Sequence, residues 1–215
     1  AALRKQGNQV TVLEAMPRIL QRVTAPEVAK FYGRIHAEEG VEIIADEQAI
    51  AITGDKKVAS VQCQSGNEYP ADAVIIGVGV IPNTELAAQA GLLVDNGILV
   101  DEYARTSDKD ILAAGDCTSH YNPIYQRQLR LESVQNALDQ ATVAANTICD
   151  NLKPYSALPW FWSDQYDLKL QIAGLSQGYN NVVIRGDIKT SRSFAAFYLQ
   201  DEKLLAVDAV NSPQA

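Results

Sequence analysis

Residues 111–116 read ILAAGD, an almost continuous apolar run that ends in Gly115 and Asp116. Such a run predicts a buried β-strand, because a strand covered on both faces needs apolar side chains at every position. In open α/β sheets, nucleotides bind at the carboxyl edge of the strands, where Asp116 would lie. The Asp116 carboxylate could accept a hydrogen bond from a ligand hydroxyl, and Gly115 could donate its backbone N–H to phosphate. An ordinary turn aspartate would give the same six letters.

Downstream of this run, a long helix is predicted to open at Glu132-Ser133-Val134-Gln135 and to continue to about residue 151. Apolar residues recur along it at helical spacing: Val134, Ala137, Leu138, Ala141, Ala145 and Ile148. The N-terminal amides and the positive end of the helix dipole suit the electron-rich edge of an aromatic cofactor. Glu132 would equally be explained as a favourable acid in a first helical turn.

Upstream, strand and helix signals alternate. We expect a helix end at residues 1–6, a strand at 9–15 that ends near Glu14, a helix at 25–39 with a capping box, a strand at 41–45, a hairpin around residues 54–55, a further strand near 68–69, a buried central strand at 72–79 (DAVIIGVG) and a helix at 83–90.

Glu14 stands where a dinucleotide fold places a carboxylate for the adenosine ribose, although a solvated loop acid would look the same. Gly79 would let a planar ligand approach the backbone, or it marks a tight connection.

The C-terminal part has a different pattern. After a proline-bounded linker at residues 153–159, PWFWSDQ places three aromatic residues in a row, which could pack at a domain junction, wall a cofactor or face a partner. Four apolar stretches follow, LKLQIAG, NVVIRGD, SFAAFYL and LLAVDAV, separated by Gly, Asn and Asp. This alternation of short strands and turns predicts a separate antiparallel unit.

Composition excludes several classes of protein. The chain has 215 residues, 47% of them hydrophobic, and a formal net charge of −8, which argues against a nucleic-acid partner. No apolar run is long enough to span a bilayer, and no signal peptide is recognised, so no membrane association is expected. Cys63, Cys117 and Cys149 lack the spacing of a disulfide framework or a metal site, and they predict free thiols in a reducing cytoplasm.

Both ends of the chain predict an internal piece of a longer protein. The chain opens inside a helix, without a methionine or a cap. It closes on NSPQA (211–215), which reads as a turn that leads into a further segment.

Five segments, in this order and spacing, resemble the FAD-dependent pyridine-nucleotide reductases, specifically the NADH:ferredoxin or rubredoxin reductases of oxygenase systems. They are VTVLEAMPRIL, VGVIPNTELA, DILAAGDC, RLESVQNALDQA and LPWFWSDQYDLKLQIAGL. The resemblance implies an α/β fold with truncated Rossmann-like sheets of the glutathione-reductase type, plus a C-terminal α+β domain with an antiparallel sheet. On that template, residues 1–102 are part of an NAD-binding domain, 103–153 a segment of the FAD-binding domain and 154–215 part of the C-terminal domain. Both GxGxxG fingerprints lie outside the chain.

The resemblance also implies an FAD site. Asp116 would hold the ribityl chain of FAD, and Gly115 belongs to the same cofactor-binding set. Ser133, Val134 and Gln135 would approach the flavin ring.

An NAD site is implied in the same way. Glu14 and Arg22 would flank the adenosine moiety, and Gly79 and Glu132 would lie near the nicotinamide. Trp162 would stand beside the place where flavin and nicotinamide meet.

The implied activity is transfer of a hydride from NADH to FAD and then of single electrons to a ferredoxin or rubredoxin. NADH is favoured over NADPH because Ala15 stands where an NADPH-preferring relative would place a basic residue. The reaction needs no acid–base side chain, so no catalytic residue is predicted. With His36 and His120 as the only histidines, no metal site is predicted either. Two alternatives stay open: an NADH oxidase or disulfide-reductase-like flavoprotein, and a catalytically inactive fragment of the reductase.

Overall fold

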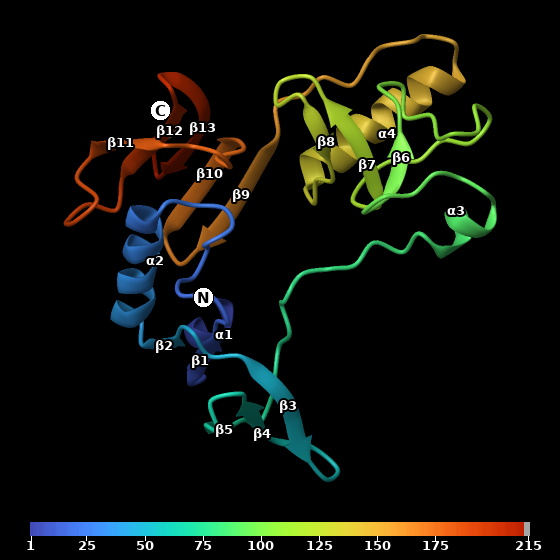
Figure 1. The fold of residues 1–215 in the computed structure, drawn as a ribbon. Coiled ribbons are helices and arrows are strands. Elements are labelled where there is room, and N and C mark those ends of the chain that lie inside the picture. The colour runs from blue at the N-terminus through green and yellow to red at the C-terminus, as the bar shows by residue number, and fades with distance from the viewer. Residues whose placement is uncertain (213–215) are drawn as a thin grey trace. The chain divides into compact units, whose positions relative to one another are not determined.

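The computed structural model describes residues 1–212, so that Pro213, in the turn predicted at the C-terminal end, lies outside the described residues. The chain forms two compact units (Figure 1). The first comprises residues 1–78, 163–171 and those from 175 on, and the second comprises residues 79–162 and 172–174. The domain bounds drawn from the resemblance remain predictions.

The N-terminal part of the first unit is a parallel βαβ arrangement of the Rossmann type. Its elements are α1 (Ala2–Lys5), β1 (Val10–Leu13), α2 (Pro26–Glu38) and β2 (Val41–Ile44). β1 and β2 pair in parallel, from Val10 opposite Val41 to Leu13 opposite Ile44. The predicted capping box is wrong: α2 begins with Pro26 after Ala25 as N-cap, and no side chain caps it. The Thr24 hydroxyl instead donates to the carbonyl of Leu20.

The predicted hairpin is confirmed and belongs to a three-stranded antiparallel sheet, β3 (Ala49–Gly54), β4 (Val58–Cys63) and β5 (Glu68–Pro70). The side chain of Glu47 stabilises the turn between β4 and β5. Its carboxylate accepts hydrogen bonds from Ser65, Asn67 and Tyr69. These donors hold the pKa of Glu47 below its ordinary value.

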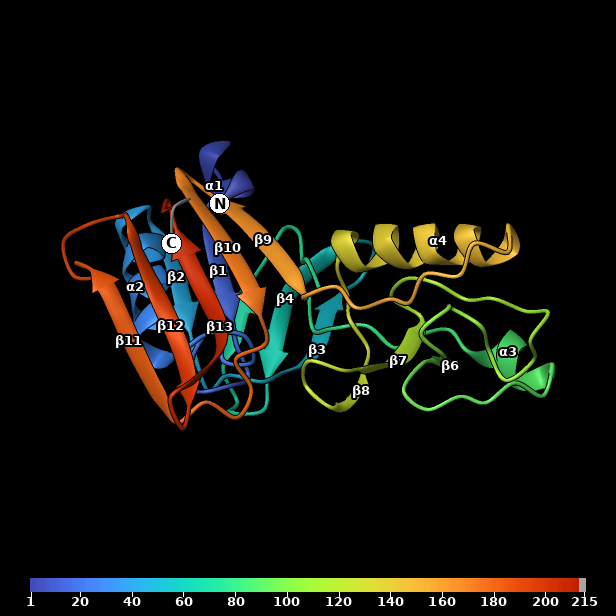
Figure 2. The same cartoon turned by 90° about the horizontal axis from the view of Figure 1, so that it is seen from above.

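The C-terminal strands form the predicted antiparallel unit. The sheet has five strands in the order β11-β12-β13-β10-β9: β9 (Trp160–Gln165), β10 (Leu168–Gly174), β11 (Asn181–Gly186), β12 (Phe194–Gln200) and β13 (Lys203–Val210). The β11–β12 and β12–β13 pairs are antiparallel. In the first unit, α2 packs on this sheet (Figures 1 and 2). Phe31 meets Phe194 edge-on at 4.8 Å, and Ala25 donates its N–H to the Tyr198 hydroxyl at 2.9 Å.

The second unit contains a small mixed sheet and the long helix. Its elements are α3 (Glu85–Gln89), β6 (Ile98–Val100), β7 (Thr118–Asn122), β8 (Arg127–Leu129) and α4 (Val134–Ile148). β6 pairs in parallel with β7, and β7 pairs antiparallel with β8. A core of Ala104, Val143 and Tyr155 packs with Leu112, Ala144 and Ala157.

Two predicted strands do not form. Residues 72–79 have no strand pairing, and Ile75, Ile76 and Val78 are 78%, 68% and 82% exposed. Residues 110–116 also form no strand, apart from a single bridge between Arg105 and Leu112. An apolar run becomes a buried strand only beside other strands that accept its backbone hydrogen bonds, and the described residues supply none next to these two segments.

The buried face of α4 is the polar one. Val134, Leu138 and Ile148, three of the apolar residues at helical spacing, are 56%, 63% and 71% exposed. The buried side carries Asn136, Gln140, Val143 and Thr147. The hydrogen-bonding needs of these polar residues determine how the helix is seated, as the candidate site shows. Within residues 1–212, no helix combines the length and apolar character needed to cross a membrane.

Candidate functional site

Asp116 lies in a tight turn that runs from Gly115 to Thr118. The Thr118 N–H donates to the Gly115 carbonyl at 3.0 Å, which closes the turn. Gly115 has a φ of +88°, a conformation that other residues adopt only at a cost. A side chain there would meet the Ala137 methyl at 3.6 Å, so conformation rather than space requires the glycine. Asp116 itself is exposed.

The buried side chain of Gln140, from the middle of α4, holds this turn. Its Oε1 accepts the Gly115 N–H at 2.7 Å and faces the Thr118 hydroxyl at 2.8 Å. Gln140 is 2% exposed, so both contacts are shielded from water. This arrangement corrects one expectation: the Gly115 amide is already engaged and is not free to donate to phosphate.

A histidine completes the polar network beneath the turn. Because Gln140 Oε1 is the acceptor, its Nε2 must be the donor, and it lies 3.1 Å from His120 Nδ1. The His120 proton therefore sits on Nε2, a buried atom without a partner in the described residues. Burial lowers the pKa of His120, which keeps the ring neutral. The ring meets Tyr155 edge-on at 4.9 Å, and Tyr155 donates to Asn136 Oδ1 at 2.9 Å.

The N-terminus of α4 lies next to this turn. Ser133 is the N-cap: its Oγ accepts the Asn136 N–H at 3.1 Å. Arg130 connects the turn with the helix start, because its Nη1 lies 3.2 Å from the Asp116 carbonyl and 2.8 Å from Glu132 Oε1. The first amides of a helix, here those of Val134 and Gln135, have no intrahelical acceptor and can face a ligand.

The aromatic segment is held at the same helix end. Gln135 accepts the Trp160 N–H on Oε1 at 3.2 Å and donates from Nε2 to Asp139. Trp160 and Trp162 stack with their ring centroids 5.1 Å apart, and Trp162 is 45% exposed. The side chain of Gln135 thus positions the aromatic segment.

The structure therefore places the predicted flavin-side residues in one unit. Those residues are Gly115, Asp116, Ser133, Val134, Gln135 and Trp162, and Glu132, predicted to lie near the nicotinamide, belongs to the same unit. Sequence reasoning missed Arg130, Gln140, His120, Tyr155 and Asn136, which hold them in place. One sequence pattern could have indicated them: the polar residues Asn136 and Gln140 follow the Ser133 N-cap at helical spacing, on one face of α4.

The residues predicted to bind NAD are more dispersed. Glu14 follows β1; its N–H donates to Ile44 O at 2.9 Å, and its Oε1 accepts the Met16 N–H at 2.9 Å. Arg22 is exposed in the same unit. Gly79 opens the second unit with a φ of +103° and open space around its α-carbon.

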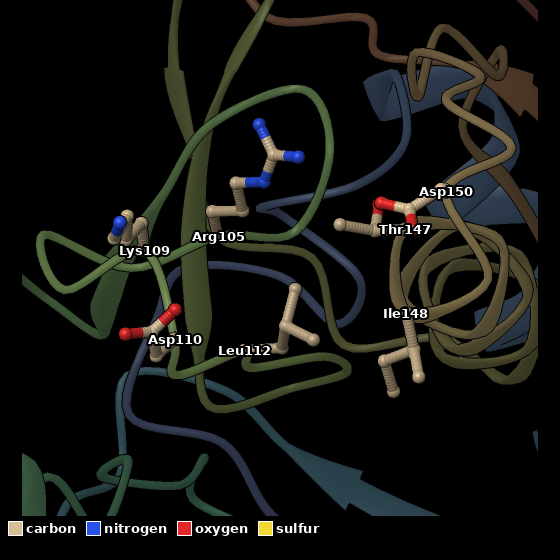
Figure 3. Close-up of a pocket in the computed structure, with 7 residues that line it drawn as sticks. All are labelled: Arg105, Lys109, Asp110, Leu112, Thr147, Ile148 and Asp150. Carbon is tan, nitrogen blue, oxygen red and sulfur yellow. The ribbon is translucent and has the colours of Figure 1, made fainter.

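A pocket of about 420 Å³ lies at the opposite, C-terminal end of α4 (Figure 3). Figure 3 shows Arg105 and Lys109 on one side of it and Thr147, Ile148 and Asp150 at the helix end on the other. None of the predicted site residues lines this pocket. In the part of the chain that the structure describes, no cluster of His, Cys, Asp and Glu could hold a metal ion.

Comparison with known proteins gives two family matches. Residues 1–141 match the pyridine nucleotide-disulphide oxidoreductases, and residues 160–215 match the family described as reductase C-terminal.

Individual relatives cover nearly all of the chain. Putidaredoxin reductase CamA of Pseudomonas putida is 46% identical over 212 residues, which is 97% of this chain and 50% of that protein. Rhodocoxin reductase of Rhodococcus erythropolis is 44% identical, over 100% of this chain and 50% of that protein. The covalent putidaredoxin reductase–putidaredoxin complex superimposes with a TM-score of 0.91 at 46% identity, over 95% of this chain and 50% of that chain. The chain spans about half the length of the curated relatives it matches.

Proposed function

The chain belongs to the pyridine nucleotide-disulphide oxidoreductase family, and from that premise we propose that its protein is an NADH-dependent, FAD-containing reductase that serves a ferredoxin or rubredoxin of an oxygenase system. Relatives that cover nearly all of the chain are named as reductases of putidaredoxin and rhodocoxin. Others are named as reductases of ferredoxin and rubredoxin. A bound flavin would supply the chemistry, as a two-electron acceptor from NADH and a one-electron donor to an iron–sulfur protein.

One observation carries the proposal: an exposed carboxylate and a helix N-terminus are fixed beside each other in one unit. Gln140 and Arg130 hold the Asp116 turn against the start of α4. An elongated ligand with hydroxyl groups at one end and an electron-rich ring at the other fits this pair of features. The residues present therefore fit the ribityl and ring portions of FAD.

The chain's own residues have binding and orienting roles in this proposal. Asp116 accepts from a ribityl hydroxyl, the amides of Val134 and Gln135 face the ring, and Trp162 covers the site from the aromatic segment. Glu14 and Arg22 would bind the adenosine part of NADH, and Gly79 and Glu132 would border the nicotinamide. No acid–base residue is assigned, because alignment of the two rings is the main requirement.

We also propose that the protein is cytoplasmic. Cys63, Cys117 and Cys149 are all free, and Cys149 is exposed. An exposed thiol without a partner suits a reducing compartment.

Anaerobic titration of the complete protein tests the proposal. NADH, and NADPH in a parallel sample, are added while the flavin absorbance is followed. We expect NADH to bleach the flavin at far lower concentration than NADPH, and the reduced protein then to reduce a ferredoxin or rubredoxin. A colourless protein, or one indifferent to both nucleotides, would refute the proposal. Rapid NADH consumption with oxygen and no iron–sulfur protein would instead favour the NADH oxidase alternative.

A further inference from the structure

We propose that Gln140 is a positioning residue of the flavin site, which acts through Asp116 by holding both ends of the Asp116 turn with one side-chain oxygen. The inference rests on the proposed function, because it assigns a role toward the same cofactor. It assigns that role to a residue of the helix interior, two turns away from the helix start that was predicted to approach the ring.

The geometry of the turn carries the inference. An amide oxygen has two lone pairs, and Gln140 Oε1 has two donors in reach, the Gly115 N–H at 2.7 Å and the Thr118 hydroxyl at 2.8 Å. The Thr118 hydroxyl also lies 2.8 Å from the Gly115 carbonyl, so its single proton is shared between the helix and the turn. Helix and turn are thereby joined at the first and last residues of the turn.

The Gly115 N–H, which can only donate, fixes the orientation of the Gln140 amide. The oxygen must point to the turn, and Nε2 is then directed at His120 Nδ1. A flipped amide would direct an NH₂ group at the Gly115 N–H and leave two buried donors unpaired, which is costly where water cannot compensate. The pairing therefore selects the conformation in which the turn is held.

Asp116 is the residue that gains from this arrangement. It lies between the two held residues, and its carbonyl accepts from Arg130 at 3.2 Å, so the backbone on either side of its side chain is fixed. An exposed carboxylate whose backbone is fixed loses less conformational freedom when a ligand hydroxyl binds it. Loss of the Gln140 oxygen should weaken the hold on the flavin chain and leave the nicotinamide contacts unaffected.

Three variants of the complete protein test the inference. Gln140→Met keeps the length of the side chain but removes the acceptor. Gln140→Glu keeps the acceptor, and His120 can change tautomer to donate to its second oxygen. Thr147→Val is the matched control: Thr147 lies on the same buried face of α4, is 8% exposed and donates to the Tyr103 carbonyl at 2.8 Å, but it does not touch the turn.

The measurements are the FAD dissociation constant of each apoprotein, from flavin fluorescence quenching, and the melting temperature of each apoprotein. We expect Gln140→Met to bind FAD about tenfold more weakly, equivalent to about 1.4 kcal/mol. Gln140→Glu and Thr147→Val should stay within about threefold of the wild type, although Thr147→Val also lowers the melting temperature. When saturated with FAD, Gln140→Met should keep the wild-type KM for NADH.

Several results would overturn the inference. Wild-type FAD affinity in Gln140→Met would do so, as would a loss in Gln140→Glu or in Thr147→Val equal to that in Gln140→Met. A wild-type protein that binds no FAD would be a different failure, because it removes the proposed function itself.

Discussion

Asp208 lies on β13 with none of its surface exposed, and its carboxylate accepts a hydrogen bond from the Tyr198 hydroxyl. Its Oδ1 atom has no hydrogen-bond partner in the described residues. Burial raises the pKa of Tyr32 of α2, and the nearby charge of Asp208 raises it further. Burial raises the pKa of Asp208 to about 7, and the Tyr198 hydrogen bond offsets only part of that shift. We predict that Asp208→Asn removes a large pH dependence from the stability of the protein.

The sign and size follow from proton linkage. Because the folded-state pKa of Asp208 is raised, the folded protein keeps this proton where the unfolded chain has lost it. The stabilising contribution is complete below about pH 3.8 and is lost as the pH rises to about 7. The shift of about three pKa units corresponds to about 4 kcal/mol in all, and to about 3 kcal/mol between pH 5 and pH 8. Tyr32, Tyr198 and Tyr179 form a cluster with Asp208. The pKa values of Tyr32 and Tyr198 are themselves raised by burial.

Urea unfolding of the complete protein and its variants at about pH 5 and pH 8 checks the prediction. The free energy of unfolding of Asp208→Asn, relative to wild type, should rise by about 3 kcal/mol between these values. Asp187→Asn is the control: donors from Thr190 and Lys189 lower the pKa of Asp187, so its titration lies wholly below this range. A constant difference between Asp208→Asn and wild type would show that Asp208 is ionised throughout, and the reasoning from burial would fail.

Three further predictions concern the candidate site. Gly115→Ala should lower the free energy of unfolding by about 1–2 kcal/mol, measured in urea, because an alanine is strained at a φ of +88°. Ser133→Ala should cost about 1 kcal/mol in the same assay, since the Asn136 N–H loses its cap, and an unchanged midpoint would argue against the cap. Glu14→Gln, which keeps an acceptor for the Met16 N–H, should raise the KM for NADH with kcat unchanged, because ribose hydrogen bonds of about 0.5–1.5 kcal/mol each are weakened; identical kinetics would remove Glu14 from the site.

Elements with local signals were predictable from the sequence. The β3–β4 hairpin is set by its turn at Gly54, and α2 by Pro26 at its start and Gly40 after its end. Such signals act through the backbone conformation of a few neighbouring residues, so they need no knowledge of the rest of the fold. The antiparallel C-terminal strands were predictable for the same reason.

The strand predicted at residues 72–79 failed because its signal is not local. A continuous apolar run indicates burial on both faces, but burial depends on which strands lie alongside. In this chain Ile76 and Val78 are 68% and 82% exposed, although their side chains have high strand propensity. Propensity and periodicity describe what a segment can form, and pairing decides what it does form.

The site shows the same division between local and long-range causes. Asp116 and Ser133 were singled out by local patterns, the apolar run that ends at Gly115 and the start of the long helix, although that run forms no strand. Gln140 was not, because its role depends on Gly115 and Thr118, more than twenty residues away along the chain. Counting apolar residues on α4 selects the wrong face, since Leu138 is 63% exposed while Gln140 is 2% exposed.

Hydrogen-bond requirements explain why the polar face prevails. A buried glutamine is tolerated only when its oxygen and its NH₂ group are both paired, and few positions in a small unit provide two donors and an acceptor together. The Asp116 turn and His120 provide that combination, so they fix the rotation of α4 about its axis. An apolar stripe, by contrast, can pack on any apolar surface and defines no single rotation. A prediction of this site from sequence must therefore ask which buried polar side chains can satisfy one another before it asks which residues are apolar.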